Sequence, residues 1–423
     1  MKEDFLHYLW QNKKFDFANL QTSDGEFLQI LNVGHYLQQE GPDFFNAQII
    51  IGTQKWAGNI EIHLKSSDWY LHHHETDENY DNVILHVVWE NDTAIFRQNN
   101  TEIPVLEIKA YVNPDLIHLY QKLKAKKSWI NCENNIQFVP QFVFKNWQER
   151  LFFERLERKS NPILQLLAEN NSDWEATLFC FLVKNFGLNS NGEAFLQLAK
   201  SIPFSVIRKE SFDVQYLEAL LFGQANLLMP NPEDSYGKEL VTIYEYLVIK
   251  YKLPPKINLP MHFFRLRPDN FPTIRLAQLA MLLHLQRNLF SKIMEAKSIN
   301  EIYQIFDVNV SDYWYSHYNF EKQSKQKSKF ISKSFIDLLL INAIVPFKFS
   351  YYQSLGKDVS EENIRFMEAL KPEKNAIIDK FKEFHINANS AFETQTLLQL
   401  KKAYCENGKC LQCVIGIELL KSG

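Results

Sequence analysis

Apolar and polar residues change their spacing near residue 113 of this chain. Before that point, apolar residues occur in short runs that alternate with polar residues at every second position, as in β-strands with one buried face. A short amphipathic helix is expected at 3–12. The alternating runs predict strands at 28–33, 46–52, 58–65, 83–88, 94–97 and 105–111.

After about residue 114, apolar residues recur with helical spacing, and Pro and Gly stand mostly between the runs. Helices are expected at 142–159, 174–186, 213–228, 238–250, 274–289, 334–345, 360–370 and 394–404. The predicted fold class is therefore mixed α/β and α+β. An N-terminal domain with a mixed sheet would cover residues 1–113, and a large all-α domain would cover residues 114–423.

Composition and charge narrow the class of protein. Hydrophobic residues make up 46% of the 423 residues, which is ample for a globular core. The net charge of −4 means that a nucleic-acid partner would need a local basic patch. The first residues are charged where a secretion signal is apolar, and the apolar run at 335–347 is too short to cross a bilayer. A soluble cytoplasmic protein without membrane contact is expected, and its oligomeric state is left open.

Two acidic residues stand at related places in neighbouring predicted strands. Asp43 follows a Gly-Pro turn and opens one strand, while Glu61 lies on the next, on the same face as His63 and Lys65. Carboxylates suit Mg²⁺ or Mn²⁺, so Asp43 and Glu61 would hold the metal, and His63 or Lys65 would activate water or stabilise charge. Glu40 could add a third carboxylate. The alternative is that Asp43 caps a turn and Glu61 pairs with Lys65 on a solvated face.

Pro42-Asp43 and Glu61-Ile62-His63 resemble the core motif of the PD-(D/E)XK nuclease superfamily, which has Pro-Asp at the start of one strand and Glu-X-Lys on the adjacent strand. This resemblance implies a restriction-endonuclease-like sheet domain and metal-dependent hydrolysis of DNA or RNA phosphodiesters. His63 departs from the pattern because it replaces the lysine. In this interpretation Asp68 and His74 would orient water or bind the phosphate backbone. A non-catalytic nucleic-acid-binding or scaffold protein on a degenerate nuclease fold is the alternative.

Histidines after the second acidic strand allow a further hypothesis. His72, His73 and His74 are consecutive, and in an extended chain His72 and His74 would share a face. Together with His63, Asp77 and His86 they offer nitrogen and oxygen ligands for Zn²⁺ or Mn²⁺. A zinc-dependent hydrolase that uses His63, His74 and His86 is therefore a third interpretation. The alternative is a polar loop with a structural His86 bonded inside the sheet.

An arginine-rich segment marks a predicted helix start near Pro272. Helix N-termini and guanidinium groups both bind phosphate, so the segment would contact a nucleic-acid backbone. An Arg-rich connector that pairs with carboxylates between helices is equally consistent with this pattern. The arginines are Arg265, Arg267 and Arg275.

Three cysteines lie close together near the C-terminus, at Cys405, Cys410 and Cys413. Cys132 is the natural fourth ligand, since Cys180 lies in an apolar helical run. Four thiolates suit Zn²⁺ or a [4Fe–4S] cluster, and such a centre would be structural. The alternative is a set of reduced thiols, because an odd cysteine count without a secretion signal argues against disulfides.

The whole chain resembles the domain-of-unknown-function 2851 family, which implies no activity. The segments that carry this resemblance are 41–44, 58–65, 68–70, 80–88, 265–272 and the cysteines from 405 to 413.

Overall fold

The computed structural model describes residues 1–37, 41–124 and 128–421, which form two compact units. The first contains Met1–Trp147, Glu383–Ile386 and Leu400–Gly423, and the second contains Gln148–Lys382 and Asn387–Gln399. The predicted fold class is confirmed, because a mixed sheet near the N-terminus precedes a large helical region. Residue 113 lies inside the first unit, and a domain boundary there stays a prediction.

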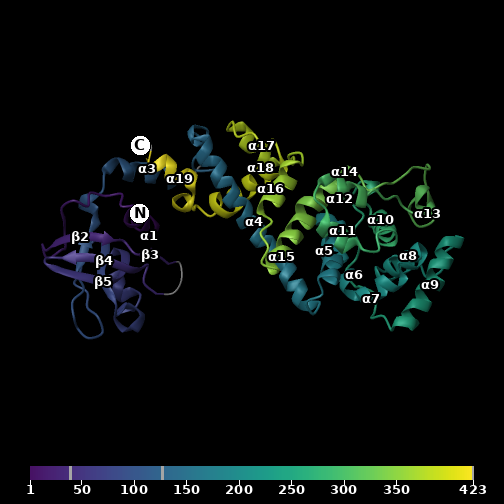
Figure 1. Cartoon of the computed structure of the whole chain (residues 1–423), viewed down its shortest axis with the longest axis horizontal. Helices are drawn as coiled ribbons and strands as arrows, with labels where there is room; N and C mark the ends of the chain where they lie inside the picture. Colours follow the sequence, from purple (N-terminus) through teal and green to yellow (C-terminus); the bar gives the residue numbers. More distant parts are fainter. Residues whose placement is uncertain (38–40, 125–127, 422–423) are drawn as a thin grey trace. The chain divides into compact units, whose positions relative to one another are not determined.

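The first unit is built on one mixed sheet (Figure 1). Strands β2, β4 and β5 are antiparallel neighbours, whereas β5, β6 and β7 run parallel, and β3 adds to β4. The strands are β1 (Leu20–Gln21), β2 (Phe27–Asn32), β3 (His35–Tyr36), β4 (Phe44–Ile51), β5 (Gln54–Lys65), β6 (Val83–Glu90) and β7 (Val105–Glu107). The helices of this unit include α1 (Glu3–Gln11), α2 (Asp68–Leu71), α3 (Pro114–Lys124) and α19 (Val414–Lys421).

The two faces of the sheet are covered differently. Ile60 and Ile62 of β5 belong to a core cluster with the apolar residues of α1, such as Phe5 and Leu9. Because side chains alternate along a strand, Glu61 and His63 lie on the other face. A second, smaller cluster of buried apolar residues forms around Trp69 in the same unit. Polar residues of β5 are thus enclosed by protein, which makes them unusual for a solvated sheet face.

The chain from 141 to 399 is mostly helical. Several helix starts carry side-chain caps; for example, Asp173 accepts the backbone N–H groups of Glu175 and Ala176. A short hairpin is formed by β8 (His317–Asn319) and β9 (Lys322–Gln323). The helices are α4 (Gln141–Glu169), α5 (Trp174–Phe186), α6 (Leu188–Ser201), α7 (Phe204–Glu210), α8 (Val214–Gln224), α9 (Ser235–Tyr251), α10 (Pro272–Leu285), α11 (Leu289–Glu295), α12 (Ile299–Ile305), α13 (Asp312–Tyr315), α14 (Lys333–Leu339), α15 (Val345–Ser354), α16 (Ser360–Glu368), α17 (Ala376–Glu383) and α18 (Ala391–Gln399).

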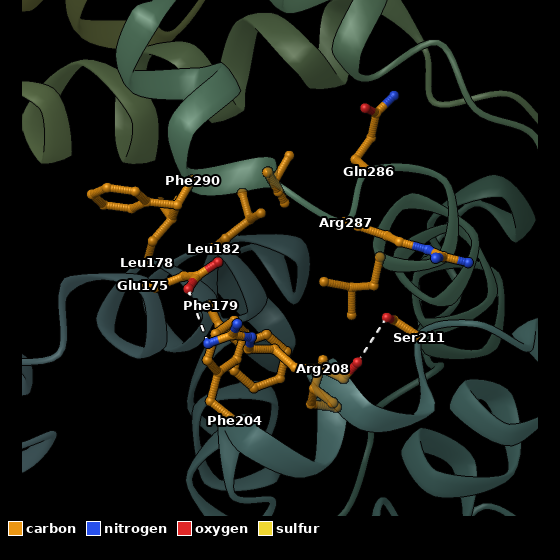
Figure 2. Close-up of a pocket in the computed structure, with 13 residues that line it drawn as sticks. Glu175, Leu178, Phe179, Leu182, Phe204, Arg208, Ser211, Gln286, Arg287 and Phe290 are labelled. Carbon is orange, nitrogen blue, oxygen red and sulfur yellow. Dashed lines mark hydrogen bonds and ion pairs between the residues drawn. The ribbon is translucent and has the colours of Figure 1, made fainter.

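A small depression lies beside α5 and α7 in the second unit (Figure 2). Its volume is about 40 Å³, and its lining is mostly apolar, with Leu178 and Phe290 among the residues. Arg208 and Glu175 form an ion pair there at 3.7 Å. Because the lining offers a single carboxylate and no histidine or cysteine, the depression does not resemble a catalytic site.

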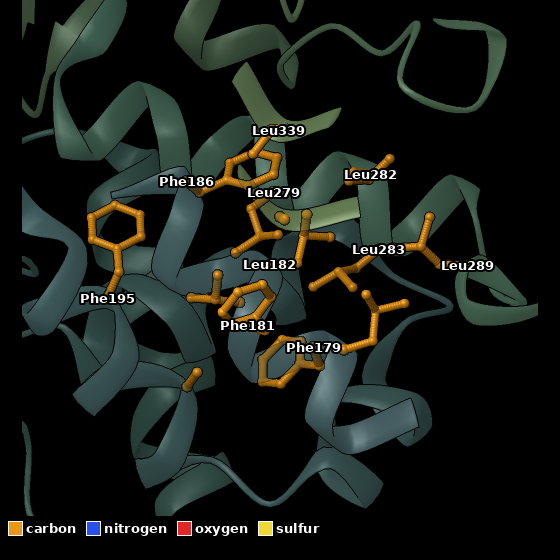
Figure 3. Packing of buried hydrophobic residues seen from close by; sticks show 14 of the residues in the cluster. Phe179, Phe181, Leu182, Phe186, Phe195, Leu279, Leu282, Leu283, Leu289 and Leu339 are labelled. Atoms are coloured by element: carbon orange, nitrogen blue, oxygen red, sulfur yellow. The ribbon is translucent and has the colours of Figure 1, made fainter. Parts of the chain in front are cut away.

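Helix α5 lies inside the core of the second unit (Figure 3). Its residues from Ala176 to Val183 are all buried, and Phe186 follows them one turn later. A helix that is apolar on all sides requires neighbours on all sides. Helix α10 is one of them, and its Leu279, Leu282 and Leu283 lie near the phenylalanines of α5 in Figure 3.

Most predicted elements are present, but some differ in extent. Helix α5 spans the predicted 174–186, while α4 continues beyond the predicted residue 159 and carries Pro162 inside it. The predicted strand at 94–97 is wrong, because in this described segment only Phe96 forms a bridge, with Glu102. The predicted strand at 105–111 ends at Glu107 and continues as a 3-10 turn. A short segment that lacks a pairing strand cannot maintain strand geometry. The local pattern of residues therefore predicts strands that are absent or shorter in the structure.

The helical run Lys333–Ser354 is long and apolar enough to cross a membrane by length and composition. It extends the apolar stretch at 335–347 because a π-helical turn, Leu340–Ile344, joins α14 to α15. Within the unit, 72% of its most apolar window is buried. This burial is what a core helix of a globular unit shows.

Glu218 on α8 is a buried carboxyl that predicts a pH effect on stability. It accepts hydrogen bonds from Tyr236 at 2.8 Å and Ser311 at 2.6 Å, but burial still raises its pKa from 4.5 to about 7. Between these values the folded state binds more protons than the unfolded state, so this group's contribution to stability falls as pH rises. Across pH 4.5 to 7.5, the free energy of unfolding of wild type should fall by roughly 2–3 kcal/mol relative to Glu218→Gln.

Urea denaturation of both proteins at several pH values measures this difference. Parallel pH profiles for wild type and Glu218→Gln would contradict the prediction.

Candidate metal centre

Asp43 and Glu61 meet where β4 and β5 lie side by side. The backbone N–H of Asp43 donates to Glu61 Oε2 at 3.1 Å, and the backbone N–H of Ile62 donates to Asp43 Oδ2 at 3.0 Å. Each carboxylate is therefore held by the backbone of the other acid's segment. Asp43 directly precedes β4, and Phe44 pairs with Ile60, so the antiparallel register brings the two acids together.

Two histidines lie next to Glu61, and a third lies next to one of them. Glu61 Oε1 lies 3.4 Å from His63 Nε2 and 3.4 Å from His74 Nε2. His63 Nε2 lies 3.1 Å from His72 Nδ1. One ring nitrogen from each of His63, His72 and His74 lies within 4.8 Å of the others. We call these three histidines, together with Glu61, the histidine centre.

The segment after β5 places His72 and His74. Trp69 of α2 is fully buried, which anchors this segment against the sheet. His73 adopts a left-handed conformation with φ +62° and is exposed. His72 and His74, the residues on either side of it, belong to the histidine centre. The His74 ring stacks on Tyr80 with centroids 3.7 Å apart.

Three donor–donor distances in the histidine centre match those of a tetrahedral metal site. Nitrogen and oxygen ligands at 2.0–2.1 Å from Zn²⁺ lie about 3.3–3.4 Å from one another. The three separations above are 3.1, 3.4 and 3.4 Å. His72 is exposed while His63 is buried, so one side of the site is open to solvent. The donor atoms therefore fit a metal ion, and because the four donors fill a tetrahedron, a reacting water would bind as a fifth ligand on the exposed side.

His86 of β6 contacts the histidine centre through the second ring nitrogen of His63. The parallel register of β5 and β6 pairs Glu61 with His86, and His86 Nε2 lies 2.9 Å from His63 Nδ1. A histidine that binds metal through Nε2 keeps its proton on Nδ1 and donates it to an outer partner. His86 is such a partner for His63, and it lies one step outside the ligand set.

Burial determines the protonation of the centre. Burial, followed by neighbouring imidazoles, lowers the pKa of His63 to about 2 and that of His86 to about 3. It also lowers the pKa of His74. Neutral imidazole is the form that binds metal. Burial, followed by the charge of Asp43, raises the pKa of Glu61 to about 9. A nearby cation has the opposite effect and favours the carboxylate.

His7 of α1 completes the surroundings of Asp43. Its Nε2 lies 3.1 Å from Asp43 Oδ2, and its Nδ1 lies 3.2 Å from the hydroxyl of Tyr36. Burial lowers the pKa of His7, but the bond to Asp43 and the neighbouring carboxylates outweigh it and raise the pKa above its ordinary value. The sequence analysis missed His7, because a helical histidine 36 residues before Asp43 carries no local signal.

Residues 3–376 match the model of a family described as "Protein of unknown function (DUF2851)". The chain belongs to this family. No curated protein and no solved structure matches it. The DUF2851 match includes His7, Asp43 and the histidine centre. It ends before Cys405, so the C-terminal cysteines lie outside it.

Two residues predicted for the acidic site have other contacts in the DUF2851 chain. Lys65 is exposed, and its ammonium lies 4.0 Å from Glu90 and 3.9 Å from Asp92 rather than at the acids. Asp68 accepts the backbone N–H of Lys65 at 3.0 Å at the start of α2. These two side chains thus have local partners beside the histidine centre. Glu40 lies outside the described residues.

The arginines divide into two groups. Arg265 and Arg267 are exposed and remain available to a ligand. Arg275 is buried; its guanidinium donates to Gln278 at 2.8 Å and to Asn270 at 2.5 Å, and lies 3.5 Å from the centroid of Phe335. Arg275 of α10 thus lies in the core, whereas the sequence analysis predicted that it would contact phosphate.

The four predicted cysteine ligands come together in the first unit. Cys132, Cys405, Cys410 and Cys413 line one pocket, whereas Cys180 is buried in α5. Burial, together with neighbouring cysteines, raises the pKa of Cys132 to about 12 and that of Cys413 to about 11. Spacing in the sequence indicated the group of Cys405, Cys410 and Cys413, and Cys132 was predicted as the fourth because Cys180 lies in an apolar helical run.

Proposed function

We propose that this DUF2851 chain is a metal-dependent hydrolase that cleaves phosphodiester bonds of nucleic acids. The observation that carries the proposal is the approach of Glu61, His63, His72 and His74 to one point, beside Asp43. Buried imidazoles and carboxylates at ligand spacing are expensive to assemble unless they bind a cation or carry out chemistry.

The donor atoms favour a transition metal. The sequence suggested Mg²⁺ or Mn²⁺ between Asp43 and Glu61, which are oxygen ligands. The three histidine nitrogens suit Zn²⁺ or Mn²⁺ better, because Mg²⁺ prefers oxygen. When bound, such an ion supplies positive charge and lowers the pKa of a bound water toward 7.

The chain's own residues would position groups and move protons. Asp43 holds His7 at 3.1 Å, and a histidine with a raised pKa can donate a proton to a leaving oxygen. Tyr36 orients the other nitrogen of His7. His86 fixes the ring of His63, and the backbone N–H of Asp43 fixes Glu61.

The choice of nucleic acid as substrate rests on the resemblance to PD-(D/E)XK nucleases. Pro42-Asp43 directly precedes β4, and Glu61 lies on the antiparallel partner β5, as that motif expects. His63 takes the place of the lysine and belongs to the histidine centre. The exposed Arg265 and Arg267 are the candidate contacts for the phosphate backbone.

Cleavage assays on the full chain test this proposal. Labelled single-stranded DNA, duplex DNA and RNA are incubated with Mn²⁺, Zn²⁺ or Mg²⁺ in turn, after metal removal with a chelator. Cleavage is expected with Mn²⁺ or Zn²⁺ and none in chelator. Asp43→Asn keeps an oxygen to accept the Ile62 N–H but loses the charge beside His7, so cleavage should fall about 10–100-fold with unchanged metal content.

Equal rates for Asp43→Asn and wild type would remove Asp43 from the mechanism. Cleavage that persists in chelator would exclude the metal-dependent reaction.

A non-catalytic nucleic-acid-binding protein is the second candidate. The observation that favours it is His63, which is buried and bonded to His86 where the nuclease motif has lysine. Gel-shift binding of the same substrates without cleavage under every metal condition would select this candidate.

A further inference from the structure

The pocket of four cysteines is built from two segments that lie far apart in the sequence. Cys132 follows α3, and the other three lie between α18 and α19. The pocket has a volume of about 20 Å³, which is the size of a small enclosed site rather than a substrate cleft. Cys413 is buried, and the other three are partly buried.

Contacts around the pocket fasten the two segments together. Asn131 Nδ2 donates to Cys410 Sγ at 3.4 Å. Lys401 donates to the carbonyl of Trp129 at 3.1 Å, and its ammonium lies 4.7 Å from the centroid of that ring. Polar contacts thus join residues beside the cysteines of the two segments.

Gly416 shows how closely the cysteine loop approaches α19. A Cβ at this position would lie 2.1 Å from the carbonyl oxygen of Cys410. The backbone of this loop can take this path only because residue 416 has no side chain.

Disulfide bonds do not account for the grouping of the four thiols. Among the described residues, no cysteine forms a disulfide. A group of four cysteines at one place in a chain of this size matches the donor number of closed tetrathiolate sites. Such sites are structural, because no position stays open for substrate.

We propose that Cys132, Cys405, Cys410 and Cys413 bind one thiophilic metal centre that ties the C-terminal segment to the segment after α3. Four thiolates accept either a zinc ion or a [4Fe–4S] cluster, and both share this chemistry. The centre is separate from the histidine centre and does not depend on the proposed hydrolysis.

Metal analysis of the full chain, purified without oxygen, tests the proposal. Wild type is compared with Cys405→Ser, which removes one partly buried ligand, and with Cys180→Ala, which removes a cysteine outside the pocket. We expect Cys405→Ser to lose about one zinc per chain, or about four irons with equal acid-labile sulfide. Cys180→Ala should keep the wild-type content.

The histidine centre also binds metal in the proposed function, so the comparison is repeated with His72→Ala as background. The loss caused by Cys405→Ser should be the same in both backgrounds. A second measurement on wild type uses a mercurial thiol reagent, which should release the metal in proportion to the thiols modified. Unchanged metal content in folded Cys405→Ser, or no metal released from wild type by the reagent, would overturn the proposal.

Discussion

His72→Ala should weaken metal binding at the histidine centre by more than about 100-fold and reduce hydrolysis by a similar factor. Loss of an outer partner of a metal ligand already costs about 10–100-fold, and His72 is a direct ligand in the proposed site. Its Nδ1 lies 3.1 Å from His63 Nε2, but its side chain is exposed. Removing it therefore leaves no cavity, and the fold should be unaffected.

Isothermal titration with Zn²⁺ and Mn²⁺, followed by the cleavage assay, measures both effects. The matched control is His73→Asn, which changes the adjacent histidine. Asn tolerates the left-handed backbone at this position, with φ +62°. The control should bind metal and cleave as wild type does. If both variants behave alike, the histidine centre is not the metal site.

Gly223→Ala should destabilise the helical unit by about 3 kcal/mol or more, since overpacking against a ring that cannot move is costly. A Cβ on Gly223 would lie 2.2 Å from Cδ2 of Tyr244, where α8 crosses α9. The Tyr244 ring is held in place, because its hydroxyl donates to Gln224 at 2.8 Å in the core. Relief of the overlap would require α8 and α9 to move apart.

Gly192→Ala is the control for this prediction. Gly192 also lies inside a helix, α6, but the nearest atom to an added Cβ is the Lys184 carbonyl oxygen at 3.4 Å, an ordinary contact. Ala is about 1 kcal/mol better than Gly in a helix interior, so this variant should be neutral or slightly more stable. Denaturant unfolding measures both variants, and a Gly223→Ala protein as stable as wild type would refute the packing argument.

Local pattern predicted the parts of the fold whose own residues enforce them. The strand at 58–65 alternates because one face packs on α1, and β5 includes the whole of it. The run 174–186 is apolar at almost every position and forms α5 without a shift in either end. Segments with weaker patterns, such as 94–97, followed their tertiary surroundings instead.

The partners of Asp43 and Glu61 could be predicted only in part. The acids stand on adjacent strands, and the antiparallel register of β4 and β5 follows from the short turn between them. His63 shares a face with Glu61 by alternation alone. His7 was not foreseen, because it reaches Asp43 from α1 through tertiary packing.

The loop histidines show where spacing is insufficient. His72 and His74 would share a face only in an extended chain, but this segment is helical at α2 and turns at His73. His72, rather than His86, lies at the exposed side of the histidine centre, and this depends on the path that the loop takes over the sheet. His86 instead lies behind His63, since β6 is parallel to β5.

The order of residues along the chain was enough to predict the mixed sheet, the helical region, the pairing of two acids and the group of three C-terminal cysteines, because each depends on period or spacing along the chain. Which side chains are buried, as Arg275 is, and which meet across elements, as His7 and Asp43 do, followed only from the folded molecule. Burial and contact between distant segments depend on the packing of the whole unit, and no short stretch of residues encodes it.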